Sequence, residues 1–218
     1  LPVTPEQLIE EAVRAYEAGA AVAHVHVRNP ETGLPCADQE LFRTVAAGVK
    51  KRCDMVVCCT TGGRLGELVE NRVRVVASLS PELATLNAGS LNFALFHIAD
   101  NYTEWKYDWE QNYLQASEDF IFPNTFLTMR QFLERFAPQS TKPEFEIYDT
   151  GMINNLAFLI EKGIVKKPVY LQFVMGILGG IPATIENFVF LLESARKAIG
   201  DFQFSVCAAG RTQFNLCT

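Results

Sequence analysis

The chain has 218 residues, of which 49% are hydrophobic and 20% are charged, with a formal net charge of −6. This composition is ordinary for a globular domain, and the acidic balance without a Lys/Arg-rich block disfavours a nucleic-acid-binding protein. No apolar run approaches the roughly 20 residues of a transmembrane helix, and the N-terminus does not resemble a signal peptide. The six cysteines show no C-x-x-C spacing, so buried thiols in a cytoplasmic protein are expected rather than a disulfide framework.

Predicted helices and strands alternate along the chain. A helix is predicted over residues 5–19, with Thr4 as its N-cap, Pro5 in its first turn and Gly19 at its end. Further helices are predicted near 38–50, 66–77, 126–136, 152–163 and 184–200, and strands over 20–27, 55–60, 83–87, 144–148, 168–174 and 202–208. Several of these strands are continuous apolar runs, which is typical of parallel strands buried on both faces.

Polar or Gly-rich segments follow nearly every predicted strand, as in "RNPETG", "TTGGR", "NAGSLN" and "MGILGG". Such segments after many different strands are typical of a (β/α)₈ TIM barrel, whereas a doubly wound sheet concentrates them at one switch point. Six strands do not close a barrel. We therefore expect one α/β TIM-barrel domain over residues 1–218 that lacks its first and last strands.

The predicted strand over residues 20–27 places His24 and His26 two positions apart and hence on one face. Two imidazoles side by side are half of a zinc site, but hydrogen-bonded histidines in a polar strand end fit the local pattern equally well. His97, the third histidine, lies in a predicted loop and is interpreted as structural.

Other strand ends carry candidate binding groups, each with a structural alternative. Thr60, Gly62 and Gly63 offer a hydroxyl and backbone N–H groups for an oxyanion, or form a simple turn. Thr85 and Asn87 share a face, while Asn87 and Ser90 are equally suited to capping a turn. The carboxylates of Glu144 and Glu146 share a face and are costly to bury unless paired or functional; Asp149 follows them. Gly176, Gly179 and Gly180 suit close approach of a ligand, and Arg211 suits an anion or a neighbouring carboxylate.

Seven segments together resemble the β-keto acid cleavage enzymes, in the same order and over essentially the whole chain. They are "LPVTPEQLIEEAV", "AHVHVRNPETGLP", "TTGG", "PELATLNAGSLNF", "EFEIYDTGMI", "LQFVMGILGGI" and "SVCAAGRTQF". The best-known activity of that family is 3-keto-5-aminohexanoate cleavage in lysine fermentation. The resemblance implies a zinc-dependent TIM barrel, commonly a homotetramer, that condenses a β-keto acid with acetyl-CoA to give acetoacetate and a new acyl-CoA.

The resemblance also implies roles for individual residues. His24 and His26 match the zinc-binding histidines, Thr60 matches a substrate-contacting position, Thr85 and Asn87 match the keto-acid pocket, and Glu146 matches an active-site acid. We accordingly expect Glu146 and Thr60 to be catalytic, with Gly62, Gly63, Thr85, Asn87 and Ser90 binding substrate as well. Gly176, Gly179, Gly180 and Arg211 are expected to bind CoA.

Two family features are missing from the sequence: a preceding strand with an acidic residue, and an eighth strand with an Arg and a Glu-Asp pair. We therefore expect an excerpt or a truncated form. The competing hypotheses are a non-catalytic remnant that binds acyl-CoA or a partner subunit, and a metal-dependent aldolase that needs no CoA. The aromatic insertion over residues 97–125 is suited equally to a lid and to a subunit contact.

Overall fold

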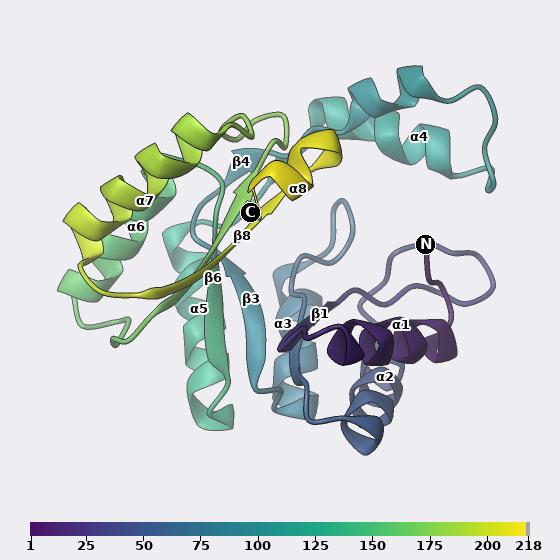
Figure 1. Cartoon of the computed structure of the whole chain (residues 1–218), viewed down its shortest axis with the longest axis horizontal. Coiled ribbons are helices and arrows are strands. Elements are labelled where there is room, and N and C mark those ends of the chain that lie inside the picture. The colour runs from purple at the N-terminus through teal and green to yellow at the C-terminus, as the bar shows by residue number, and fades with distance from the viewer. Residues whose placement is uncertain (217–218) are drawn as a thin grey trace. The chain divides into compact units, whose positions relative to one another are not determined.

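The structure is a computed structural model, and it describes residues 1–216. Within residues 1–216, eight strands and eight α-helices form an α/β fold (Figure 1). The helices are α1 (Pro5–Glu17), α2 (Gln39–Arg52), α3 (Val69–Leu79), α4 (Glu110–Gln115), α5 (Phe126–Phe136), α6 (Thr150–Glu161), α7 (Ile185–Ile199) and α8 (Gln213–Leu216). Short 3₁₀ helices span η1 (Phe96–Asn101), η2 (Ala116–Asp119), η3 (Ala137–Gln139) and η4 (Gly210–Thr212).

Six strands form one sheet in the order β1-β2-β3-β6-β7-β8. Their bounds are β1 (Val22–Val25), β2 (Val56–Cys59), β3 (Leu83–Asn87), β6 (Lys142–Ile147), β7 (Tyr170–Met175) and β8 (Gln203–Ala208). The pairings β1–β2, β2–β3, β6–β7 and β7–β8 are parallel. All six predicted strands are thus confirmed, and the sheet is consistent with part of a TIM barrel. Closure into eight strands remains a prediction.

The chain divides into two compact units, which share β3, α5 and β6. The first unit comprises residues 1–85 and 132–143, and the second comprises 86–131 and 144–216 among the described residues. The backbone bond from Lys142 N to Glu82 O, at 3.0 Å, lies in the first unit. The bond from Ala88 N to Glu146 O, at 3.1 Å, lies in the second.

In the first unit, helices α1 and α2 lie side by side (Figure 1). Helix α1 begins with the predicted cap: the Thr4 hydroxyl accepts from Gln7 N, and the Gln7 side chain accepts from Thr4 N. Gly48 in α2 lets the two helices approach, because a Cβ there would overlap Ile9. The core of this unit includes Phe42, Val45 and Val49, all at most 1% exposed.

In the second unit, α6 and α7 pack together, and the segment around α4 extends away from them (Figure 1). The two-residue strands β4 (Leu91–Asn92) and β5 (Ile121–Phe122) pair antiparallel, and β5 lies within the insertion over residues 97–125 that was noted in the sequence. His97 lies in η1 and is exposed, so the predicted loop is a short helix there.

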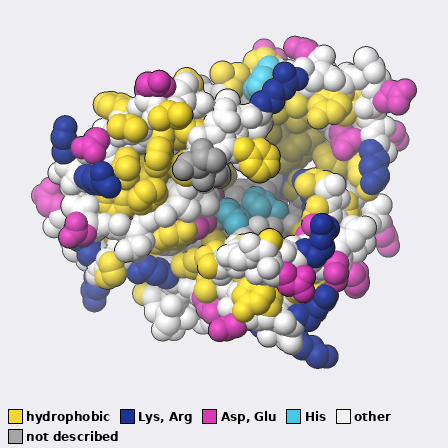
Figure 2. All heavy atoms as spheres, viewed as in Figure 1, with side chains coloured by type: hydrophobic (Ala, Val, Ile, Leu, Met, Phe, Trp, Pro, Cys, Tyr) yellow, Lys and Arg dark blue, Asp and Glu magenta, His cyan; other side chains and the backbone are white. Residues whose placement is uncertain are grey.

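The distribution of charged side chains and the apolarity of the helices both agree with the composition. Lys/Arg and Asp/Glu side chains are interspersed on the face shown in Figure 2. No helix in residues 1–216 is both long and apolar enough to cross a bilayer.

Candidate functional site

The side-by-side placement of His24 and His26 is confirmed. Their rings stack with centroids 5.0 Å apart and an interplanar angle of 21°. Strand β1 is shorter than predicted and ends at Val25, so His26 lies just past it. Both rings nevertheless remain on one side of the chain, as the two-residue period of an extended backbone requires.

Both imidazoles are held in the neutral form. Burial, and to a smaller extent the charge of the neighbouring His26, lowers the pKa of His24 to about 3. Burial, and to a smaller extent the Arg28 charge, lowers the pKa of His26 to about 4. Part of the His26 surface nevertheless reaches solvent. A neutral imidazole is the form that coordinates a metal ion, so the electronic state of the pair suits a metal site.

Cys58 lies next to His24 on the neighbouring strand. The parallel register pairs His24 with Cys58, and a ring nitrogen of His24 lies within 4.8 Å of the Cys58 sulfur. Cys58 and Cys59 are fully buried, as the sequence predicted, and burial raises the pKa of Cys59 to about 12. The sequence analysis did not connect Cys58 with the histidines, because that link depends on strand register. Cys217 lies outside the described residues.

The turn after β2 is tightly bonded within the chain. Gly62 N donates to Thr60 Oγ1 at 3.1 Å. Thr61 N donates to Thr85 Oγ1 at 2.9 Å, and Thr61 Oγ1 donates to Thr85 O at 2.7 Å. The predicted turn is therefore confirmed. The hydroxyls of Thr60 and Thr85 each accept one bond in this turn. A binding role for Thr60, Gly62, Gly63 and Thr85 stays a prediction.

Asn87, the last residue of β3, is the most unusual polar residue of the second unit. Its side chain is 1% exposed, and neither Nδ2 nor Oδ1 has a hydrogen-bond partner among the described residues. A buried amide without partners is costly, so an external ligand that bonds to it would relieve that cost. Ser90, by contrast, has a partner: its Oγ accepts from Asn124 N at 2.8 Å, which ties this turn to a segment 34 positions further along the chain.

Glu144 and Glu146 on β6 are both buried, with exposures of 1% and 8%. They lie two positions apart on the strand, hence on one face, and pair in register with Tyr170 and Gln172 of β7. Burial, and next the Glu146 charge, raise the pKa of Tyr148 well above its ordinary value. Burial fits the expected inward orientation of Glu146, whose catalytic role stays a prediction. Asp149 is the N-cap of α6 and accepts from Gly151 N.

The segment after β7 is occupied largely by the chain itself. A Cβ on Gly179 would overlap the carbonyl oxygen of Asn92, and one on Gly180 would lie 2.9 Å from Tyr148 O. The close approach expected of a ligand is thus made by the protein's own backbone at these two positions. Arg211 lies in η4 and is exposed. Binding of CoA by Gly176, Gly179, Gly180 and Arg211 remains a prediction.

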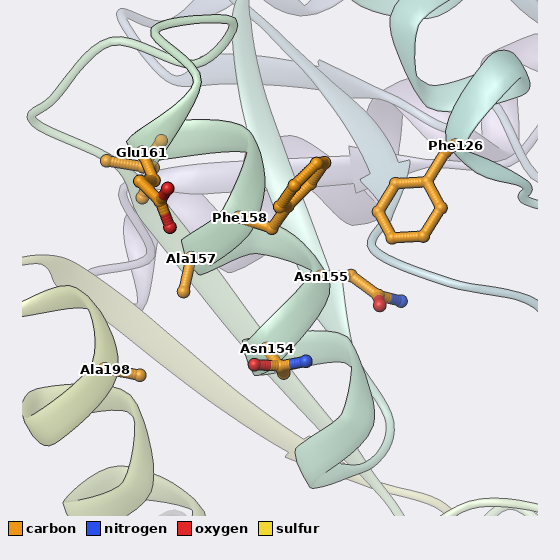
Figure 3. A pocket seen from close by; sticks show the side chains of 8 residues that line it. Phe126, Asn154, Asn155, Ala157, Phe158, Glu161 and Ala198 are labelled. Carbon is orange, nitrogen blue, oxygen red and sulfur yellow. The ribbon is translucent and has the colours of Figure 1, made fainter.

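A hollow of about 840 Å³ lies elsewhere in the second unit, on the outer side of α6 (Figure 3). Phe126 and Phe158 meet edge-to-face at its side, with ring centroids 5.6 Å apart. None of the site residues predicted from the sequence lines it. The described strand ends, rather than this hollow, therefore carry the candidate chemistry.

A family model described as the beta-keto acid cleavage enzyme matches residues 1–218. The chain belongs to the β-keto acid cleavage enzyme family. It is 38% identical over 219 residues to a 3,5-dioxohexanoate:acetyl-CoA acetone transferase of Paraburkholderia graminis, which covers 100% of this chain and 71% of that relative. It is 34% identical to a 3-keto-5-aminohexanoate cleavage enzyme of Acetoanaerobium sticklandii, covering 98% of this chain and 68% of that relative. The predicted family is confirmed.

Among solved structures, the apo structure of ObcA matches all of this chain with a TM-score of 0.70 and 18% sequence identity. At that identity the match shows the fold alone. The chain spans 52% of the ObcA chain, which is about half of its length.

Proposed function

We propose that this chain carries out acyl exchange between a β-keto acid and acetyl-CoA. In the balanced reaction, R–CO–CH₂–COO⁻ and CH₃–CO–S–CoA give CH₃–CO–CH₂–COO⁻, which is acetoacetate, and R–CO–S–CoA. The observation that carries this proposal is the family match over residues 1–218. The names of several relatives, which specify acetyl-CoA together with a dioxo or dehydro substrate, support it further.

We propose that His24 and His26 hold a zinc ion. Their stacked rings offer nitrogen donors from one side of the chain, and both imidazoles are neutral, which fits the donor set that zinc prefers. The ion, when bound, polarises the β-ketone as a Lewis acid. The remaining ligands are not assigned.

The other predicted residues divide the remaining tasks. In the second unit, the Asn87 amide, with both polar atoms unpartnered in the described structure, binds substrate oxygen, and Ser90 is proposed to bind substrate as well. In the first unit, the proposed substrate-binding groups are the Thr60 hydroxyl and the groups of Gly62, Gly63 and Thr85. Glu146 holds or moves a proton of the substrate. Gly176, Gly179, Gly180 and Arg211 form the CoA subsite, in which the Arg211 guanidinium pairs with a phosphate.

We also propose that residues 1–218 belong to one TIM-barrel domain of a cytoplasmic homotetramer. The parallel sheet of six strands supports the barrel, because its strand order follows the chain order. The oligomeric state and the location rest on the family resemblance.

The two competing hypotheses predict different chemistry. A metal-dependent aldolase consumes a β-keto acid without acetyl-CoA, and a non-catalytic remnant consumes nothing. Neither is favoured, since the matching relatives are named as cleavage enzymes and acetyl-CoA transferases.

The deciding experiment is a panel of β-keto acids incubated with the purified protein, with and without acetyl-CoA labelled with ¹³C at its carbonyl carbon. We expect consumption only with acetyl-CoA, and label at the ketone carbon of acetoacetate, because the acetyl carbonyl becomes that ketone. Label in the other acyl-CoA product, consumption without acetyl-CoA, or no consumption of any panel member would contradict the proposal.

A further inference from the structure

Arg72 is a buried cation that the proposed mechanism does not use. It lies in the first turn of α3, and its side chain is among the largest that are fully buried, with 2% exposure. Its guanidinium carbon lies 5.1 Å from the centroid of the Phe132 ring. Buried arginines are rare, because an ionised side chain loses its hydration on burial, so this one calls for a specific reason.

The Arg72 side chain reaches the turn after β2. Arg72 Nε donates to the carbonyl oxygen of Thr61 at 2.7 Å. The stem of Arg72 also lies directly against the turn, since a Cβ on Gly63 would come 3.2 Å from Arg72 Cγ. A charged donor makes a shorter and stronger bond to a carbonyl than a neutral one does.

This bond fixes more than one carbonyl group. The peptide unit between Thr61 and Gly62 is planar, so the direction of the Thr61 carbonyl also sets the direction of the Gly62 N–H. That N–H donates to Thr60 Oγ1 at 3.1 Å. Arg72, the peptide unit and the Thr60 hydroxyl therefore form one connected chain of hydrogen bonds.

The connection sets the role of the Thr60 hydroxyl. A hydroxyl oxygen that accepts a bond from Gly62 keeps its own proton for donation. The side chain is 7% exposed, so a donated bond meets little competition from water.

We propose that Arg72 is a positioning residue, which orients Thr60 through the Thr61–Gly62 peptide to donate to an anionic oxygen of the β-keto acid. This inference deepens the proposed function and rests on it. A purely structural Arg72 would stabilise α3 against the turn without affecting ligand affinity through Thr60.

The test is a double-mutant cycle on ligand binding. Acetoacetate binding is measured by isothermal titration calorimetry for the parent, Arg72→Lys, Thr60→Val and the double variant. Lysine keeps the charge but lacks the planar Nε donor. We expect each single change to weaken binding about tenfold, and the double variant to be about as weak as either single one.

Arg74→Lys is the matched control, because Arg74 lies on the same helix and is exposed. It should bind acetoacetate as the parent does. Effects of Arg72→Lys and Thr60→Val that multiply to about a hundredfold, or parent-like affinity in Arg72→Lys, would overturn the inference. So would a parent that does not bind acetoacetate.

A second variant keeps the test decisive if Arg72→Lys does not fold. Thermal unfolding is recorded for every protein, and if Arg72→Lys is not folded, Phe132→Leu replaces it in the cycle, since Phe132 supports the guanidinium. A smaller loss of affinity that is likewise not additive with Thr60→Val is expected, and an additive one overturns the inference. Turnover is not used as the readout. A parent that binds acetoacetate but shows no acetyl-CoA-dependent turnover would refute the proposed function alone.

Discussion

Two Gly-rich segments follow parallel strands in this chain, and they are built differently. After β2, side chains hold the turn: the Thr60 hydroxyl accepts from Gly62 N, and Arg72 holds the Thr61 carbonyl. After β7, backbone bonds hold it: Gly176 N donates to Ile181 O at 2.9 Å, and Ile181 N donates to Tyr148 O at 2.8 Å. The first segment thus presents polar side chains, whereas the second makes room for neighbouring backbone.

The difference separates a glycine that packing requires from one whose bond does not depend on being glycine. Gly179 has φ +103° and lies against the Asn92 backbone, so it is required for packing of the protein's own chain. Gly62 contributes the backbone N–H that bonds the Thr60 hydroxyl, a donor that any residue except proline would supply. Composition alone does not separate these cases, but substitutions do.

The largest expected effect is on turnover, and it tests the buried carboxylate near the end of β6. Glu146→Gln keeps the shape of the side chain and removes its charge. We expect turnover with acetyl-CoA to fall about 10²–10⁴-fold, because a proton-transfer group is lost. Zinc content and the free energy of unfolding should stay near those of the parent. Full turnover in this variant would show that Glu146 has a structural role and no catalytic one.

The next effect is on stability, and it tests the packing role of the segment after β7. Gly179→Ala places a Cβ on the Asn92 carbonyl oxygen at a positive φ. We expect the free energy of unfolding in urea to fall by about 2–5 kcal/mol, from overpacking and backbone strain together.

Gly66→Ala is the matched control for that change. Gly66 also has a positive φ, at +76°, but a Cβ there meets nothing within 4 Å. Its cost should be only the backbone strain, about 1–2 kcal/mol. Equal losses in the two variants would mean that Gly179 is required for its φ alone, which would break the comparison.

The last effect concerns the metal. His26→Ala removes one proposed ligand, and we expect zinc affinity, measured by competition with a chromophoric chelator, to fall by more than the roughly 10–100-fold that loss of an outer-shell partner costs. His97→Ala is the control, because His97 is exposed in η1. Unchanged affinity in His26→Ala would remove the pair from the metal site.

Most of the fold was predictable because its signals are local. Helix α5 and strand β3 coincide with their predicted ranges, and the Thr4 cap is present as expected. Apolar periodicity and capping act over a few residues, so they can be recognised in the sequence alone. Strand β1 ends two residues early, and the β4–β5 pair was missed, because two-residue strands carry almost no periodicity.

The candidate site was less predictable because much of it depends on long-range register and burial. The histidine pair was found from its spacing. Cys58 was not linked to His24, since the sequence does not specify which residues of neighbouring strands stand opposite each other. Arg72 was also missed, because an arginine within a helical pattern is expected at the surface.

The Asn87 side-chain amide, which has no hydrogen-bond partner within residues 1–216, is unfavourable for the stability of the folded chain. An apolar side chain of similar size would satisfy the same buried space at lower cost, so selection for stability alone would replace the asparagine. The proposed binding of substrate oxygen would supply a benefit that the isolated chain does not gain. If Asn87 binds substrate as proposed, screening variants of this position for thermostability alone would select against that binding.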